Sequence, residues 1–474
     1  MYKKILFGAL LAALSTQSVN AQEQATSIED LQKEITALKE ELKSYSKKQK
    51  ENRQDIEDLY DYTEKTETLV LQDKLKLSLG YKVNMDNFSK KLADGTEVRN
   101  NSVFSSKFML NIKADIAENM KFYTRFSMYK YWGNGRVHQY SSYDNMQGRV
   151  PSVSTLFVER AYFDWFLNRE GKLPFALTIG RLPTSDGPSQ QFKANTTRKG
   201  TYSALLYDGA SDGIVGTINL SKVTNYDGTY LRLGYAKGYL YTEQSPYVTN
   251  AFIGTDNKNL KDTDVYGIFL DTKFFGMKRS LIQLSYSKMF NVIANQLDPN
   301  SKQNTNLGDF SMYGAMLELN DIKETGLDLF THFGYSQAYP NGNSYANFGS
   351  LLSNANETDQ KNGYAVWVGT RYALDKKKTV KLGAEYNHGS KNWTSLTQGA
   401  FDFYNKLSTR GDAYEAYLIY EINRNADIRI GYLTIDYKYS KSAWFVGESQ
   451  EIANLTTKDV DRVDSFYLKM SINY

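Results

Sequence analysis

Histidine, cysteine and serine most often carry out chemistry in proteins, and this chain offers few such candidates. It has no cysteine and three histidines, His138, His332 and His388. Nucleophilic catalysis needs a base that touches a hydroxyl and is oriented by a third group. Residues 386–390 (YNHGS) come nearest, but adjacent residues rarely reach that geometry, so His388 is expected to anchor a loop. Three scattered histidines do not make a metal site. We therefore expect no catalytic, metal-binding or cofactor-binding residues.

Charged side chains are the second group of candidates for chemistry. Many of them alternate with apolar residues along the sequence. Around residues 107–113, polar side chains alternate with Phe108, Leu110 and Ile112. Side chains alternate sides along a strand, so the polar side chains share one face. We expect this face, which also carries His332, to line a lumen. The same parity places five arginines there: Arg125, Arg160, Arg232, Arg371 and Arg429. Acidic residues such as Glu318 share the face, so most charges should be paired, leaving at most a slight anion preference.

Strands must position these side chains, and a period of two runs from about residue 71 to the C-terminus. The last strand, DSFYLKMSINY (464–474), is apolar on one face, polar on the other, and ends on an aromatic residue. The pattern predicts about sixteen strands, near 75–85, 102–114, 120–131, 155–166, 173–181, 213–220, 230–237, 265–273, 280–290, 310–320, 327–338, 363–373, 379–388, 414–422, 426–437 and 462–474.

The connections between these strands alternate in length. Short polar turns such as 115–119 and 423–425 alternate with long polar loops near 86–101, 132–154, 182–212, 238–264, 291–309, 339–362, 389–413 and 438–461. Short periplasmic turns and long external loops are typical of transmembrane β-barrels. The alternative, a soluble β-sandwich, gives no reason for such regular alternation. The fold class predicted is all-β, a transmembrane antiparallel barrel of about sixteen strands, with residue 474 closing onto the first strand near 75–85.

The N-terminus indicates export. Lys3 and Lys4 precede an apolar run over residues 5–14, and residues 19–21 (VNA) offer a cleavage site. Residues 1–21 therefore read as a signal peptide. Past it there is no run of about 18 apolar residues, which argues against a transmembrane helix. The whole chain has 57 basic and 53 acidic residues. This near-balance gives no reason to expect a nucleic-acid partner.

Residues 22–70 follow a different period. Apolar residues at spacings of three and four predict an α-helical coiled coil, which would precede the barrel of residues 71–474. The seam includes Ile28, Leu31, Ile35, Leu38, Leu42, Ile56 and Leu59. The alternative is a helix that folds back on its own domain. We expect a periplasmic stalk that associates with other copies of the chain, as a trimer.

Four stretches carry a family resemblance. They are IGRLPTSDGP (179–188), YDGASDG (207–213), EYNHGSKNW (385–393) and TRGDAYEAYLIYEI (409–422). With the heptads they resemble a family of uncharacterised bacterial outer-membrane proteins, known only as a domain of unknown function. The resemblance implies a signal peptide, a short coiled coil and a porin-like barrel. It implies no substrate and no catalytic residues.

The third long loop, about 182–212, begins within the first of those stretches. By analogy with porins, it is expected to fold inward and narrow the barrel, and the alternative is a surface cap. Its charged residues, and the arginine just before it, complete the candidate pore-lining set: Arg181, Asp186, Lys193, Arg198 and Lys199.

These features favour a passive channel for small hydrophilic solutes or ions in the outer membrane of a Gram-negative bacterium, with the stalk in the periplasm. The expected partners are outer-membrane lipid, those solutes, and other copies of the chain. A structural or adhesive membrane protein with a coiled-coil tether is the alternative from another class. A hydrolase at the barrel rim ranks third.

Overall fold

The computed structural model describes residues 28–132, 156–209, 211–239, 262–274, 277, 279–294, 305–397 and 402–474. The expected signal peptide and His138 lie outside the described residues. The chain divides into two compact units, Met1–Asp73 and Lys74–Tyr474.

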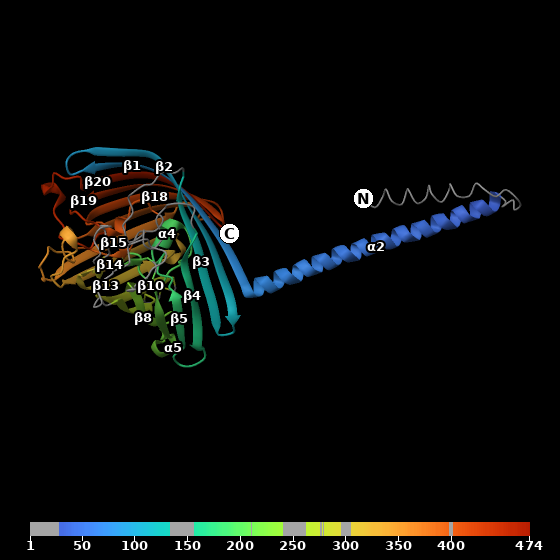
Figure 1. The fold of residues 1–474 in the computed structure, drawn as a ribbon, viewed down its shortest axis with the longest axis horizontal. Helices are drawn as coiled ribbons and strands as arrows, with labels where there is room; N and C mark the ends of the chain where they lie inside the picture. The colour runs from blue at the N-terminus through green and yellow to red at the C-terminus, as the bar shows by residue number, and fades with distance from the viewer. Residues whose placement is uncertain are drawn as a thin grey trace. The chain divides into compact units, whose positions relative to one another are not determined.

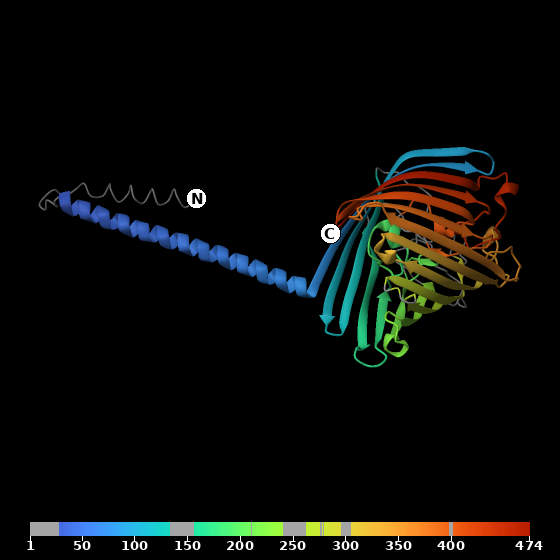
Figure 2. The same cartoon turned by 180° about the vertical axis from the view of Figure 1, so that it is seen from behind.

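Within the described residues of the second unit, sixteen strands form one closed antiparallel barrel (Figures 1 and 2). The first eight are β1 (Leu75–Leu92), β2 (Glu97–Ala117), β3 (Met120–Tyr131), β4 (Phe157–Asn168), β5 (Phe175–Arg181), β7 (Asp212–Asn219), β8 (Tyr230–Tyr239) and β9 (Thr263–Thr272). The others are β10 (Ser280–Phe290), β13 (Gly308–Leu319), β14 (Leu327–Pro340), β15 (Lys361–Ala373), β16 (Val380–Gly389), β18 (Gly411–Asn423), β19 (Ala426–Tyr437) and β20 (Val460–Asn473). Each predicted strand has its counterpart, so the predicted barrel is confirmed.

The alternating sequence explains the two faces of the wall. On β16, Leu382 is exposed on the outside, whereas Glu385 and Asn387 are buried on the inside. The same alternation exposes Phe466, Leu468 and other apolar residues of β20. An apolar exterior suits hydrocarbon, and a closed sheet leaves no unpaired edge there.

The closing seam joins the last strand to the first. Tyr474 and Leu79 exchange backbone hydrogen bonds of 2.7 and 2.8 Å, and β1 and β20 stay paired as far as Leu92 and Val460. The seam predicted from the terminal strand is therefore confirmed.

One predicted loop is wrong. Residues 86–101 continue β1 and β2, and the chain turns only at residues 93–96. Asn87, Ser89 and Lys91 make the outer face of β1 polar here, which hid the strand from a pattern based on apolar residues. Inside the barrel, Phe88 still packs against Phe403, with ring centroids 4.8 Å apart.

The first unit contains all but the last residue of the helix α2 (Ile28–Lys74), whose side chains are described for residues 33–56. Five seam-type residues lie exposed along it: Ile35, Leu38, Leu42, Tyr45 and Ile56. The side chains of Ile28, Leu31 and Leu59 lie outside the described residues. No helix among the described residues is long and apolar enough to cross a membrane. The coiled coil stays a prediction.

Short elements lie between the barrel strands. The helices are α4 (Gln190–Ala194), α5 (Ser221–Thr224), η1 (Ile322–Glu324), η2 (Ala346–Phe348), η3 (Lys406–Ser408) and η4 (Ile452–Asn454). The strand β6 (Tyr207–Asp208) pairs in parallel with β17 (Leu396–Thr397), and β11 (Ile293–Ala294) pairs with β12 (Thr305–Asn306).

The main hydrophobic core joins these connecting segments to the inner wall. Phe192, Leu206 and Trp393 come from the connections, and Phe330 and Trp367 come from the wall. The interior of the barrel is therefore partly filled.

The seam register can be tested with a disulfide, since the chain has no cysteine. Val83 and Met470 are directly opposite in the β1–β20 register. Directly opposite residues of an antiparallel pair have Cα atoms about 4.5–5.5 Å apart, which lies within the span of a disulfide. Val83→Cys with Met470→Cys should cross-link on oxidation, seen as a reductant-sensitive mobility shift of the heat-denatured chain. Val83→Cys with Ser471→Cys is the control, because Ser471 faces the lumen. Equal cross-linking of both pairs would contradict this register.

Candidate constriction site

The connection between β5 and β7 folds into the barrel and carries α4 (Figure 1). Phe192 of α4 is 1% exposed and stacks on Phe330 of the wall, with centroids 5.5 Å apart. Two glycines let the limbs of this segment meet: a Cβ on Gly187 would lie 1.9 Å from the Tyr202 carbonyl oxygen, and one on Gly200 would lie 2.4 Å from that of Ser185. We call residues 182–206 the inward loop.

A first cluster of charges holds the start of the inward loop against β3 and β4. Asp186 accepts from Arg125 Nη1 at 2.6 Å, and Arg160 Nη2 lies 3.4 Å from the same carboxylate oxygen. Glu159 is paired with Lys107 at 3.1 Å and with Arg125 at 3.3 Å. Burial alone would raise the pKa of Asp186, but the neighbouring arginines and lysines lower it well below its usual value. Asp186 is therefore ionised near neutral pH.

Arg160 also binds the backbone of the inward loop. Its two terminal nitrogens donate to the carbonyl oxygens of Lys199 at 2.6 Å and Ser185 at 2.5 Å. One guanidinium therefore joins the descending and returning limbs. Burial lowers the pKa of the Lys199 ammonium, and the nearby Asp186 only partly opposes that shift.

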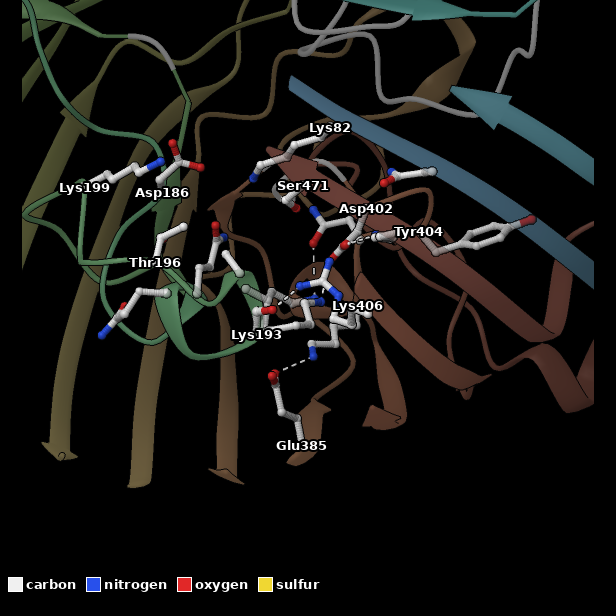
Figure 3. Close-up of a pocket in the computed structure, with 18 of the residues that line it drawn as sticks. Lys82, Asp186, Lys193, Thr196, Lys199, Glu385, Asp402, Tyr404, Lys406 and Ser471 are labelled. Atoms are coloured by element: carbon white, nitrogen blue, oxygen red, sulfur yellow. Dashed lines mark hydrogen bonds and ion pairs between the residues drawn. The ribbon is translucent and has the colours of Figure 1, made fainter. Parts of the chain in front are cut away.

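A second cluster joins the inward loop to the connection between β16 and β18 (Figure 3). Lys193 pairs with Asp402 of that connection, and its Nζ lies 3.0 Å from Glu415 Oε2 on β18. Asp402 also pairs with Lys469 of β20 at 2.5 Å. Burial would raise the pKa of Asp402, but the two lysines and Arg429 hold it well below its usual value.

Lys406 adds a tie within the same cluster. It pairs with Glu415 and, at 2.5 Å, with Glu385, which also accepts from Trp367 Nε1 at 2.9 Å. Residues 402–410 and the inward loop are thus held together directly by the Lys193–Asp402 pair and through Glu415, a wall carboxylate that both segments bind.

A third group of contacts caps the end of α4. Asn195 accepts from Lys381 Nζ at 2.7 Å and donates to Glu421 Oε1 at 2.8 Å. Arg371 donates to the Phe192 carbonyl oxygen at 2.9 Å, and Arg429 donates to that of Lys193. The carbonyl groups at the end of a helix lack partners within it, and these two arginines supply them.

The buried His332 binds both limbs of the inward loop. Its Nε2 lies 2.7 Å from Ser189 Oγ and its Nδ1 lies 2.7 Å from Ser203 Oγ. Glu318 accepts a hydrogen bond from Ser189 Oγ at 2.7 Å. In a catalytic triad a carboxylate binds the ring nitrogen that faces away from the nucleophile, but here that nitrogen, Nδ1, contacts Ser203. His388 contacts Asp412 at 2.8 Å at the end of its strand. Both histidines hold segments in place, and the described residues contain no cluster suited to a metal ion.

The structure brings seven of the ten candidate residues together. Arg125, Arg160, Arg371 and Arg429 contact the inward loop, which contains Asp186, Lys193 and Lys199. The other three do not join these contacts. Arg181 pairs with Asp212 at 3.1 Å, Arg232 pairs with Asp271 at 2.5 Å, and Arg198 lies on the inward loop but is exposed.

Sequence reasoning missed Lys82, Asp402 and Lys406. Lys82 lay on a predicted strand, where parity already pointed it inward. The other two lie in a long connection that was assigned to the outside, and no local pattern reveals their position.

A cavity with room of about 50 Å³ for water-sized groups remains beside the inward loop. It is lined by charged residues of both signs from α4, β1, β16, β19, β20 and the β16–β18 connection, and ten of its lining residues are labelled in Figure 3. A closed wall, apolar outside and charged inside, with a loop folded into it, defines a porin-like transmembrane β-barrel.

The chain belongs to the family described as "Protein of unknown function (DUF3373)", whose profile matches residues 97–474. No curated protein matches the sequence. Similar solved structures include OprB of Pseudomonas putida, with 12% identity, a TM-score of 0.49, and coverage of 86% of this chain and 96% of that one. OmpF of Salmonella typhi, solved in complex with daunomycin, has 11% identity and a TM-score of 0.46, with coverage of 85% of this chain and 99% of that one. OmpT of Vibrio cholerae has 10% identity and a TM-score of 0.44, with coverage of 84% of this chain and 97% of that one.

Removing one shared carboxylate should loosen the inward loop. Breaking a buried ion pair costs about 3–5 kcal/mol. Asp402→Asn should therefore speed amide hydrogen exchange in residues 185–206 by roughly 100-fold or more, measured by mass spectrometry. The matched control is Asp309→Asn, whose partner Lys288 is 3.6 Å away in a pair about one-third exposed. If the two variants exchange alike in this segment, Asp402 does not hold the loop.

Proposed function

We propose that this protein is a porin-like channel of a Gram-negative outer membrane, through which small hydrophilic solutes or ions diffuse passively, with a slight preference for anions. One observation carries this proposal. The barrel of sixteen strands contains a charged cavity, which lies beside the loop that narrows the barrel. Barrels of this size have room for an aqueous path. The signal-peptide pattern of the N-terminal sequence and the apolar outer wall favour the outer membrane as the location.

A structural role is the second candidate, and the filled interior favours it. Phe192, Leu206, Trp393 and their neighbours form an apolar core inside the wall. Such a core would suit a membrane anchor that does not conduct. No arrangement that we find among the described residues favours a hydrolase.

Single-channel recording separates these two candidates. The purified protein should give stepwise conductance in planar bilayers. Thr196 lines the cavity, so Thr196→Trp should at least halve the conductance by filling space there. Thr331→Trp is the matched control, because Thr331 is exposed on the outer wall. A folded protein that never conducts would favour the structural role, and equal effects of both variants would place the path elsewhere.

We also propose that residues 1–21 are removed and that the helical segment 22–70 associates with other copies of the chain, most simply as a trimer. The support is the stripe of exposed apolar residues on α2, in which Leu42 is 74% exposed. Burying such a stripe in a coiled coil would stabilise the assembly.

The stripe makes this association testable. Leu38→Glu with Leu42→Glu should convert an oligomer into a monomer, measured by light scattering of the detergent-solubilised protein. Thr36→Glu with Lys43→Glu changes the opposite helix face and should leave the oligomer intact. Deleting residues 23–70 should match the first variant. An oligomer that survives this deletion would mean that the barrel wall holds the subunits together.

A further inference from the structure

The cavity beside the inward loop carries an excess of positive charge. Its lining has six cationic side chains and three carboxylates. Lys193, Lys406 and Lys469 are paired with carboxylates in this region. The other three cations are Lys82, Lys199 and Arg429, and they make no ion pair among the described residues.

Asp186, the carboxylate beside Lys82 and Lys199, already binds other cations. Lys82 and Lys199 approach Asp186 from either side in Figure 3. Asp186, however, is bound by Arg125 at 2.6 Å and lies 3.4 Å from Arg160. It balances at most part of the charge around it. Lys82 therefore lies among Lys107, Lys199 and Arg429, which all repel it.

Arg429 presents an unfilled donor. Its Nη1 donates to the Lys193 carbonyl oxygen, but its buried Nε has no acceptor in the part of the chain that the structure describes. A buried guanidinium donor without an acceptor is costly, and an anion in the cavity could satisfy it. The side chains of Lys82, Lys199 and Arg429 are each partly exposed, as expected if they face this cavity.

The basic lining continues beyond the constriction. A second cavity, on the side of the barrel where β1 begins and β20 ends, shares Lys199 with the first. Five basic side chains and no acidic side chain are among its described lining residues: Lys76, Lys113, Arg125, Arg160 and Lys199. Lys76 and Lys113 stand directly opposite each other in the β1–β2 register. Like charges placed this way destabilise a sheet. A bound or passing anion would relieve this repulsion.

We propose that Lys82, Lys199 and Arg429 form a binding site for a small oxyanion such as inorganic phosphate, and that Lys76 and Lys113 attract that anion at the adjoining mouth. The inference rests on the proposed channel function and names its class of solute. Ammonium and guanidinium groups suit this ligand, because its oxygens accept charge-assisted hydrogen bonds.

Block of chloride current by phosphate tests the site. In planar bilayers, inorganic phosphate should reduce the wild-type chloride current, and Lys82→Gln with Lys199→Gln should raise the half-blocking concentration at least tenfold. Lys237→Gln is the matched control, since Lys237 is paired with Asp262 and Asp264 away from the cavity. Unchanged block in the double variant would overturn the proposal.

Further variants separate binding from general attraction. Lys76→Gln with Lys113→Gln should lower the anion-to-cation permeability ratio, measured as the reversal potential in a chloride gradient. The half-blocking concentration of phosphate should stay within about twofold of wild type, because these residues act at the mouth. Arg429→Lys should bind phosphate more weakly than wild type and more tightly than Arg429→Gln. Equal weakening by every lysine variant, including the Lys237 control, would mean charge screening without a site.

Thermal unfolding in detergent gives a readout that does not need conduction. Phosphate should raise the Tm of the wild type above that in chloride of equal ionic strength, because a ligand stabilises the state that binds it. The double variant, checked for heat-modifiable mobility, should lose this rise. A rise without conductance would refute the channel and retain the site. Conductance without block or a phosphate-specific rise would refute the site and retain the channel.

Discussion

The hydrogen bonds between β1 and β20 are the constraint on which the rest of the structure depends. A sheet with two open edges would leave unpaired backbone groups in hydrocarbon, and closure removes both edges. Closure also fixes which side chains point inward, because parity then holds around the whole wall. Lys82 on β1 lies opposite Ser471, and Lys469, two positions earlier on β20, lies opposite Asn84. Both lysines line the same cavity.

Burial of charge explains the arrangement inside the barrel. A charge removed from water must be paired and hydrogen-bonded, or its cost exceeds what packing returns. Asp402 and Glu415 meet this requirement by each binding two lysines, and Asp186 does so with two arginines. These shared carboxylates join segments far apart in sequence. Phe192 and Leu206 add apolar contacts with the inner wall, so the inward loop is fixed by both kinds of contact.

The sequence predicted the sixteen strands well, because strand parity is a local pattern that the barrel repeats. It failed at residues 86–101, where Asn87, Ser89 and Lys91 make the outer face polar while backbone pairing continues. For the site, parity placed Arg125, Arg160 and Arg429 inside. It did not distinguish them from Arg232, which pairs across neighbouring strands with Asp271. The role of Asp402 depends on a contact with Lys193, 209 positions away in sequence, and no local pattern encodes such a contact.

The small parallel sheet of β6 and β17 has a consequence for the order of assembly. It joins Tyr207–Asp208 to Leu396–Thr397. It therefore cannot form before most of the barrel strands have been synthesised and brought close. Contacts so distant in sequence form late, because their loop-closure entropy is large. The inner filling therefore becomes complete late in folding. An intermediate in outer-membrane insertion that lacks its final strands would therefore hold the inward loop only loosely. The constriction inside the barrel would reach its final width only when those last strands are in place.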